Sequence, residues 1–352
     1  MNKTISPNKR IVSLDIIRGF ALLGILFINI PTYQVILEGT VIPSYSALDK
    51  AIENFISIFI EKKFFSIFSF LFGVGFYIFT SRAESRGDNS RWRFTRRLLS
   101  LFVISIVHVL FFFGTILYAY AIIGFLLLPF YNASHLTICK WLVGMPITYL
   151  TALLVNLVLS NKSPILSITN FITSDSTLIF IMFLAGFFVA RTDWIIRIKD
   201  FQNQIRRVQL VTLPLFIGSS IWIWTTAQSN NKQFDLIIKI GVIPTTIFYL
   251  CTLFLLLENK TISKILTPVA YVGRMALTNY VAQSFIGLAI MSFMSIEYPL
   301  PTQVILIAAL VFVIQTLYTI IWFKFFKMGP VEKVWRFMTY GRSKKQRNKS
   351  SS

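Results

Sequence analysis

Residues 11–30 read Ile11-Val-Ser-Leu-Asp-Ile-Ile-Arg-Gly-Phe-Ala-Leu-Leu-Gly-Ile-Leu-Phe-Ile-Asn-Ile30, an apolar run that contains one acid and one base. The run is long enough to cross a bilayer as a helix, so it predicts the first transmembrane span. Asp15 and Arg18 are three residues apart and therefore share a helix face. Asn29 follows Arg18 by about three helical turns and returns to the same face. Charged groups in a span are costly unless they point into protein, so this polar stripe marks a candidate functional surface.

The composition of the 352-residue chain is that of a membrane protein. Apolar residues make up 55% of it and charged residues only 14%, whereas soluble domains average about a quarter charged. We therefore predict an all-α fold, a polytopic membrane helical bundle with about ten transmembrane helices. The predicted spans are 11–33, 63–81, 95–113, 115–131, 140–160, 177–190, 208–226, 236–257, 266–294 and 303–326.

The net charge of +20 is distributed as in a membrane protein rather than as in a nucleic-acid-binding protein. With the N-terminus in the cytoplasm, most of the 34 Lys and Arg residues fall in cytoplasmic segments. This asymmetry predicts that both termini are cytoplasmic, that the lipid bilayer is the main partner, and that no nucleic acid is bound. Two loops and the chain from Lys324 onward carry most of these cations; the loops contain Arg82, Arg86, Arg91, Arg93, Arg96 and Arg97, and Arg191, Arg197, Lys199, Arg206 and Arg207.

The Asp15–Arg18 pair has two interpretations. It can be a buried ion pair that holds the first helix against its neighbours. Alternatively, Arg18 binds an anion or an acyl-carrier headgroup near the cytoplasmic surface, and Asp15 orients it. In the second predicted span, Ser69 and Gly73 are four residues apart, which is typical of close helix packing.

His108 lies in the third predicted span, three residues after Ser105 and on the same helix face. A histidine can carry a proton at neutral pH, and one placed among apolar residues in a membrane is a candidate functional group. The alternative is a neutral imidazole that hydrogen-bonds Ser105 or a carbonyl of a neighbouring helix.

The ninth predicted span contains four polar groups. Asn279 and Gln283 share one helix face, and Arg274 and Thr278 share another. Such a span lines a wet cavity or forms a hydrogen-bonded seam with another helix, and we expect the cavity-lining role. Arg274 also lies near the cytoplasmic end, where a long side chain can reach the interface.

Several kinds of site are excluded by the residues present. Two cysteines and two histidines are too few for a metal-ligand cluster, so no metal is expected. The chain has no phosphate-cradling Gly-rich loop followed by Lys-Ser/Thr and no Gly-x-Ser-x-Gly nucleophile motif. No bound cofactor is expected.

In sequence, the chain resembles the bacterial YeiB family, whose C-terminal half is known as domain of unknown function 418. The resemblance implies a multi-pass protein of the bacterial cytoplasmic membrane. It divides the chain into an N-terminal transmembrane region over 1–190, a C-terminal YeiB-type region over 191–340, and a disordered basic tail over 341–352. The matching segments are Arg10 to Pro31 with Asp15-Ile-Ile-Arg-Gly19, Phe68-Ser-Phe-Leu-Phe-Gly-Val-Gly-Phe76, Arg96-Arg-Leu-Leu99 with His108, Ile116-Leu-Tyr-Ala-Tyr-Ala-Ile-Ile-Gly124, Val272-Gly-Arg-Met-Ala-Leu-Thr-Asn-Tyr280 and Gly329-Pro-Val-Glu-Lys-Val-Trp-Arg336.

The first span is also similar to that of the heparan-glucosaminide acetyltransferases, which share the Asp-x-x-Arg-Gly motif and a following Asn. This similarity implies a membrane acyltransferase that moves an acyl group from a cytoplasmic thioester, such as acyl-CoA as co-substrate, to an envelope or secreted acceptor. His108 would be the base or acyl carrier, with Asn29 as a second catalytic residue. Arg18 and Arg274 would contact the phosphates of the donor.

Two departures from these relatives keep an alternative open. No histidine occurs from Gln34 to Lys50, where the acetyltransferases carry one. The chain reads Gly114-Thr-Ile-Leu117 where YeiB-like chains usually read Gly-Asp-Ile-Leu, so the acid that would orient a histidine is missing. The alternative is a non-catalytic accessory protein that packs against a membrane exporter or permease, for example one for a peptide antibiotic.

Overall fold

A computed structural model describes residues 11–33, 44–159, 164–228 and 233–341. Within these ranges the chain is helical and contains no strand, which confirms the all-α fold class. Eight helical segments are long and apolar enough to cross a membrane, so the protein is a multi-pass helical bundle. They are Val12–Thr32, Ala47–Glu84, His135–Val158, Ile165–Arg191, Ile198–Ala227, Phe234–Leu257, Ala276–Phe293 and Pro301–Phe325. The predictions for the two termini fall on residues 1–10 and 342–352, outside the described ranges.

Two of the ten predicted spans do not meet these criteria, so within the described ranges the count falls to eight. The predicted span 95–113 overlaps α4 (Ser90–Val109), which ends at Val109 and whose first eight residues include four arginines. The predicted span 115–131 corresponds to the shorter apolar segment Leu117–Asn132. That segment is divided into α5 and two 3₁₀ turns, the second of which begins at Pro129. Proline removes a backbone donor and ends a regular helix.

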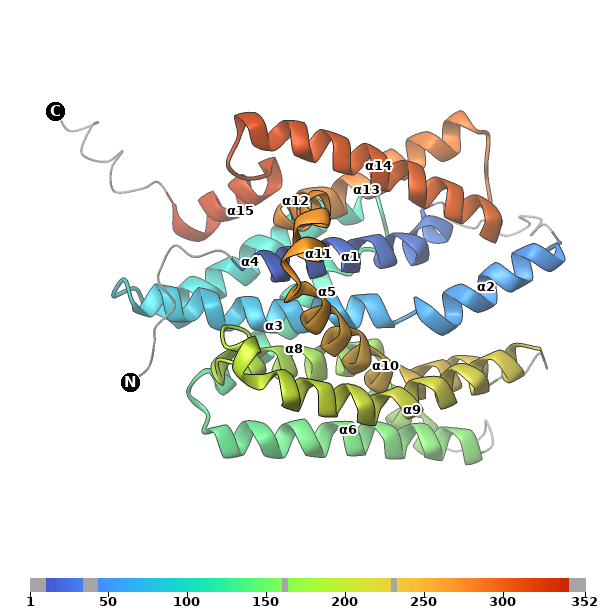
Figure 1. The fold of residues 1–352 in the computed structure, drawn as a ribbon, viewed down its shortest axis with the longest axis horizontal. Coiled ribbons are helices and arrows are strands. Elements are labelled where there is room, and N and C mark those ends of the chain that lie inside the picture. Colours follow the sequence, from blue (N-terminus) through green and yellow to red (C-terminus); the bar gives the residue numbers. More distant parts are fainter. Residues whose placement is uncertain (1–10, 34–43, 160–163, 229–232, 342–352) are drawn as a thin grey trace.

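Figure 1 shows the long helices packed roughly side by side, with α6 and α9 on one side of the bundle and α13 and α14 on the other. The α-helices are α1 (Val12–Asn29), α2 (Ala47–Phe59), α3 (Lys63–Glu84), α4 (Ser90–Val109), α5 (Leu117–Gly124), α6 (His135–Val158), α7 (Ile165–Ile172), α8 (Asp175–Arg191), α9 (Gln202–Ala227), α10 (Phe234–Leu257), α11 (Lys260–Ile265), α12 (Thr267–Arg274), α13 (Ala276–Phe293), α14 (Pro301–Phe325) and α15 (Pro330–Tyr340). The 3₁₀ helices are η1 (Ile30–Thr32), η2 (Phe125–Leu127), η3 (Pro129–Asn132) and η4 (Ile198–Phe201).

Glycines set a close helix crossing in the centre of the bundle, between α3 and α8. A Cβ atom at Gly73 would overlap the carbonyl oxygen of Phe183, and one at Gly186 would overlap that of Phe70. Only glycine allows the two backbones to approach so closely. The predicted packing role of Gly73 is thereby confirmed. Ser69 lies on the same helix and joins α3 to α5 through a 2.8 Å hydrogen bond with the hydroxyl of Tyr120.

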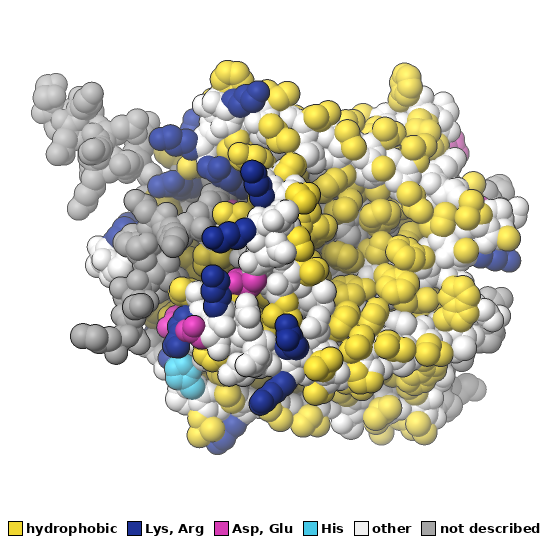
Figure 2. Space-filling view, in the orientation of Figure 1, with side chains coloured by type: hydrophobic (Ala, Val, Ile, Leu, Met, Phe, Trp, Pro, Cys, Tyr) yellow, Lys and Arg dark blue, Asp and Glu magenta, His cyan; other side chains and the backbone are white. Residues whose placement is uncertain are grey.

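Cations are concentrated toward one end of the bundle, which we call the basic end. It comprises the α3–α4 turn and α15, with Arg86, Arg91, Arg93, Arg96 and Arg336. Figure 2 shows Lys and Arg side chains in a band toward this end and apolar side chains over much of the remaining face. The expected orientation places the basic end in the cytoplasm.

Candidate functional site

A second glycine crossing, between α1 and α12, brings two sequence-distant arginines together. A Cβ atom at Gly273 would overlap the carbonyl oxygen of Asp15, and one at Gly19 would overlap that of Val269. The residues that directly adjoin these glycines, Arg18 and Arg274, both line one cavity of about 250 Å³, which we call the first cavity. The close crossing therefore places both guanidinium groups at a single site.

The Asp15–Arg18 ion pair predicted from the sequence is present. Arg18 Nη1 donates to Asp15 Oδ1 at 3.0 Å. The Asp15 side chain is only 6% exposed and that of Arg18 is 25% exposed. The pair therefore faces the protein interior, and Arg18 extends from it to the first cavity.

Arg97, predicted only as part of a basic loop, is a third arginine at the first cavity. Its guanidinium carbon lies 3.9 Å from the ring centroid of Trp335 and 4.8 Å from that of Phe79. The Trp335 indole in turn donates to the carbonyl oxygen of Arg97 at 2.8 Å. Among the described residues no carboxylate forms an ion pair with Arg97, and the nearby charge of Arg18 repels it. The pairing of Arg97 with Trp335 is visible only in three dimensions.

Glu332 on α15 is an acidic residue that lines the first cavity. Its carboxylate accepts hydrogen bonds from the backbone N–H groups of Leu277 at 2.8 Å and Thr278 at 3.1 Å, and from the Thr278 hydroxyl at 2.5 Å. It thereby caps the N-terminus of α13, whose first N–H groups have no partner within the helix. Burial nevertheless raises the pKa of Glu332 above that of an ordinary glutamate. Thr278, predicted as a cavity residue, thus serves mainly to hold Glu332.

The first cavity carries an excess of positive charge. Among the described residues, three arginines and one carboxylate line it; that carboxylate, of Glu332, is engaged with α13, and Arg18 is also paired with Asp15 behind the cavity wall. Arg274 is also oriented by Phe323, whose ring centroid lies 4.2 Å from its guanidinium carbon, and it donates to the carbonyl oxygen of Lys327 at 3.3 Å. Such an arrangement favours a multiply charged anion, because guanidinium groups form strong paired hydrogen bonds with phosphates.

A second polar cluster surrounds His108 at the far end of α4. Nδ1 of His108 lies 2.9 Å from the Thr115 hydroxyl and Nε2 lies 2.9 Å from the Ser284 hydroxyl. Ser284 donates its own proton to the Val281 carbonyl oxygen, so it accepts one from Nε2–H. In the neutral imidazole with its proton on Nε2, Nδ1 is an acceptor and Thr115 donates to it. His108 is 2% exposed.

His108 does not form the hydrogen bond to Ser105 that the sequence allowed; its hydrogen-bond partners are Thr115 and Ser284. Ser105 donates to the carbonyl oxygen of Phe102 within α4. His108 lies in the last turn of α4, and the chain then reverses so that Thr115 returns to Nδ1. The hydroxyl of Thr115, at the position where the family resemblance led us to expect an aspartate, is the hydrogen-bond partner of Nδ1 of His108.

Tyr280 connects the two polar sites. Its ring lines the first cavity, and its hydroxyl accepts a 3.1 Å hydrogen bond from the backbone N–H of Ile116. The same hydroxyl lies beside the side chains of Thr115 and Asn29, and the ring centroid is 5.6 Å from that of His108. Asn29 is thereby brought to the His108 cluster.

Asn279 and Gln283 form a hydrogen-bonded seam, not the cavity lining that we expected from the sequence. The Asn279 amide donates to the Val272 carbonyl oxygen at 2.8 Å. Gln315 of α14 donates to the Asn279 carbonyl oxygen at 2.7 Å, and Gln283 donates to Gln315 at 3.1 Å. Asn279 and Gln283 are 0% and 1% exposed and hold α13 against α14 rather than lining the first cavity.

A second cavity, of about 330 Å³, adjoins the His108 cluster from the end opposite the basic end. Asn29, Gly114 and Ile116 line it on the side of the cluster, and Lys62 and Asp175 line it on the other. No group of His, Cys, Asp or Glu within the described ranges is arranged to hold a metal ion.

Comparison with known proteins finds similarity over nearly the whole chain. The chain is 32% identical over 355 residues to an uncharacterized 39.9 kDa protein in the amylase 3' region of Bacillus acidopullulyticus, with 96% of each chain covered. The chain is also 27% identical to YxaH of Bacillus subtilis, over 95% of each chain. It is 25% identical to YeiB of Escherichia coli, over 94% of its own length and 96% of that protein. It belongs to the YeiB family.

The family model described as protein of unknown function (DUF418) matches residues 189–342 of this YeiB-family chain. The matched region contains α12, α13 and α15, which supply Arg274, Tyr280 and Glu332. α1, α4 and the Thr115 turn lie before it. No solved structure matches the chain.

Proposed function

We propose that this protein is a membrane-bound acyltransferase. It takes an acyl group from a phosphorylated thioester, such as acyl-CoA, at the basic end and transfers it to an envelope or secreted acceptor that arrives from the opposite end. The observation that supports this proposal most strongly is the position of Tyr280. This residue adjoins both a cavity lined by three arginines and the buried His108 cluster.

The charge of the first cavity supports a phosphorylated donor. Arg97 stacks between two aromatic rings and has no carboxylate partner among the residues described, so its charge is available to a ligand. Arg18 and Arg274 add two further cations at the same cavity. A cofactor-type thioester carries several phosphates, which guanidinium groups bind through strong, charge-assisted hydrogen bonds.

The spacing of the two sites supports a donor that extends through the protein. Arg18 and Asn29 lie eleven residues apart on α1, and Arg97 and His108 lie eleven apart on α4. At 1.5 Å per residue each separation is about 16 Å. A phosphopantetheine arm has a comparable length. With its phosphates at the arginines, such a donor would present its thioester near His108.

The chemistry that we propose is direct acyl transfer. The nucleophilic atom of the acceptor attacks the thioester carbonyl carbon, so that a new bond to carbon forms and the carbon–sulfur bond breaks. The acceptor's proton passes through the Thr115 hydroxyl to Nδ1 of His108, and the protonated His108 returns that proton to the departing thiolate, which leaves as a thiol. Tyr280 and Asn29 supply hydrogen-bond donors for the oxygen that becomes negative in the tetrahedral intermediate.

Donor binding can be tested with acetyl-CoA by calorimetry on the full chain in lipid nanodiscs. Arg97→Gln should weaken binding at least tenfold, because a hydrogen bond to a charged group contributes about 1.5–3 kcal/mol. Arg86→Gln is the matched control, since Arg86 lies at the same end and outside the first cavity. Equal affinities of the two variants would refute the donor site.

Transfer can be tested separately with radiolabelled acetyl-CoA and membrane fractions that supply acceptors. His108→Gln should abolish transfer and leave acetyl-CoA affinity unchanged, because His108 does not line the first cavity. Normal transfer by this variant would remove His108 from the mechanism.

The non-catalytic accessory role stands as the second candidate, supported by one observation. Both nitrogens of His108 are already satisfied by neutral hydroxyl groups, as in a structural histidine. In that case His108→Gln would leave secretion of the exported molecule unchanged. Crosslinking in mild detergent would then recover a defined exporter or permease.

A further inference from the structure

The second cavity has a mixed polar and aromatic lining that, apart from Asn29, the proposed donor does not use. Its polar residues include Asn29, Glu61, Lys62, Asp175 and Ser176. Its apolar wall includes three aromatic rings, those of Phe64, Phe65 and Tyr118. A volume of about 330 Å³ is within the range of small-molecule sites.

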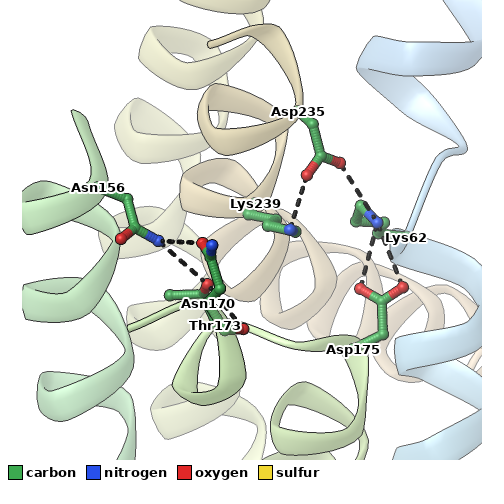
Figure 3. Close-up of polar contacts among 7 residues, drawn as sticks. All are labelled: Lys62, Asn156, Asn170, Thr173, Asp175, Asp235 and Lys239. Atoms are coloured by element: carbon green, nitrogen blue, oxygen red, sulfur yellow. Dashed lines mark hydrogen bonds and ion pairs between the residues drawn. The ribbon is translucent and has the colours of Figure 1, made fainter. Parts of the chain in front are cut away.

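The charges around this cavity are held in a chain of ion pairs. Lys62, which has a left-handed backbone at the N-terminus of α3, lies 3.2 Å from Asp175 and 3.5 Å from Asp235. Lys239 closes the chain at 2.7 Å from the other oxygen of Asp235. Figure 3 shows these four side chains converging from α3, α8 and α10.

The start of α8, which places Asp175, is held by a neighbouring amide network. The Asn156 amide of α6 donates to Asn170 at 3.1 Å and to Thr173 at 3.4 Å, as Figure 3 also shows. Asp175 follows two residues after Thr173. The wall of the cavity is therefore formed before any ligand arrives, which lowers the ordering cost of binding.

Glu61, Lys62 and Asp175 line this cavity, and together with the charged residues packed behind them they form a cluster whose charges balance. Lys63, fully buried, adds a cation that donates to the Ser57 carbonyl oxygen at 2.6 Å. The cluster then contains three acids and three bases: Glu61, Asp175 and Asp235, and Lys62, Lys63 and Lys239. A ligand with a net charge would be left without a counter-charge, and burying an uncompensated charge is costly. Hydroxyl groups can donate to the carboxylates and accept from the ammonium and amide groups.

We propose that the second cavity binds an uncharged, hydroxyl-rich molecule of about the size of one sugar ring. Its hydroxyls pair with Asn29, Glu61 and Lys62, and its apolar ring face packs on the aromatic wall. Its role as acceptor rests on the proposed acyl transfer, whereas its binding does not. Asn29 and Ile116 line the cavity beside the Thr115–His108 hydrogen bond, so one bound hydroxyl lies next to the proposed proton path.

The test uses three probes of similar size and different charge: methyl glucoside, glucosamine and glucuronate. Ser176→Cys places a thiol in the cavity wall, in a chain whose native Cys139 and Cys251 are replaced by serine. The rate of its alkylation by a polar maleimide is measured in nanodiscs free of sugar-based detergent. Ser85→Cys, at the basic end, is the control thiol and should react equally with and without probe.

Methyl glucoside should slow alkylation of the Ser176→Cys thiol at a concentration roughly tenfold lower than either charged probe requires. The reason is that a mismatched buried charge costs more than about 1.4 kcal/mol. Adding Glu61→Gln removes one negative charge, so glucuronate should then protect better than before. Protection by none of the probes, or best protection of the original thiol by glucosamine or glucuronate, would overturn the proposal. Acetyl-CoA binding is measured on the same protein, so loss of the proposed function is recognised independently.

Discussion

Gly273→Ala offers the sharpest test of how the first cavity is built. A Cβ atom at Gly273 would overlap backbone atoms of Asp15 and Gly19, which cannot rotate away as a side chain would. The α1–α12 crossing must therefore open, and Arg18 and Arg274 must separate. Overpacking of this kind costs about 1–3 kcal/mol.

Gly218→Ala on α9 is the matched control, because a Cβ atom there meets nothing within 4 Å. Both variants gain the same helix propensity, up to about 1 kcal/mol, so the difference between them isolates the overpacking term. With an unfolding entropy of about 2.1 cal/mol/K per residue over 352 residues, the midpoint of thermal unfolding should differ by about 1–4 °C.

The assay combines thermal unfolding, followed by intrinsic fluorescence at one scan rate, with acetyl-CoA calorimetry. Gly273→Ala should unfold at a lower temperature than Gly218→Ala and bind acetyl-CoA more weakly. If the two variants have the same midpoint and the same affinity, the glycine crossing does not position the arginines.

Three further predictions concern single side chains. Because the pKa of Glu332 is raised, its protonation stabilises the folded state below the ordinary carboxyl pKa of 4.5, and this stability is lost as the pH rises through the raised value. Glu332→Gln should therefore flatten the plot of unfolding midpoint against pH over that interval. Thr115→Val leaves Nδ1 of His108 without its donor and should lower the free energy of unfolding by about 1–3 kcal/mol in urea, whereas Thr115→Ser should not. Gln315→Leu breaks the α13–α14 seam and should lower the free energy of unfolding by about 1–3 kcal/mol, while acetyl-CoA affinity stays unchanged. Altered affinity would show that the seam reaches the first cavity.

Part of the candidate site follows directly from local sequence. The spacing of Asp15 and Arg18 predicts their ion pair, because residues three apart always share a helix face. Their position in an apolar run predicts that the pair points into protein. The same reasoning favoured a cavity-lining role for Asn279 and Gln283, whereas the structure places them in a hydrogen-bonded seam, because periodicity identifies a face and not the partner of that face.

The parts that local sequence could not predict depend on chain reversals and helix crossings. Thr115 reaches His108 because the chain turns back after α4, and Arg97 stacks on Trp335 because α15 packs against α4 across more than two hundred residues of chain. The second cavity likewise joins Asn29, Lys62 and Asp175 from three separate helices. None of these pairings has a fixed sequence spacing, so no periodic pattern indicates them.

By itself, the amino-acid sequence determined that this protein is an all-α bundle in a membrane, because apolar runs of bilayer length can satisfy their backbone hydrogen bonds only as helices. It also determined one polar face of the first helix. The tertiary structure alone decided which residues share a cavity. Gly19 and Gly273 let two backbones meet at one point, and that contact, which is set by packing and not by spacing along the chain, brings Arg18 and Arg274 to one site.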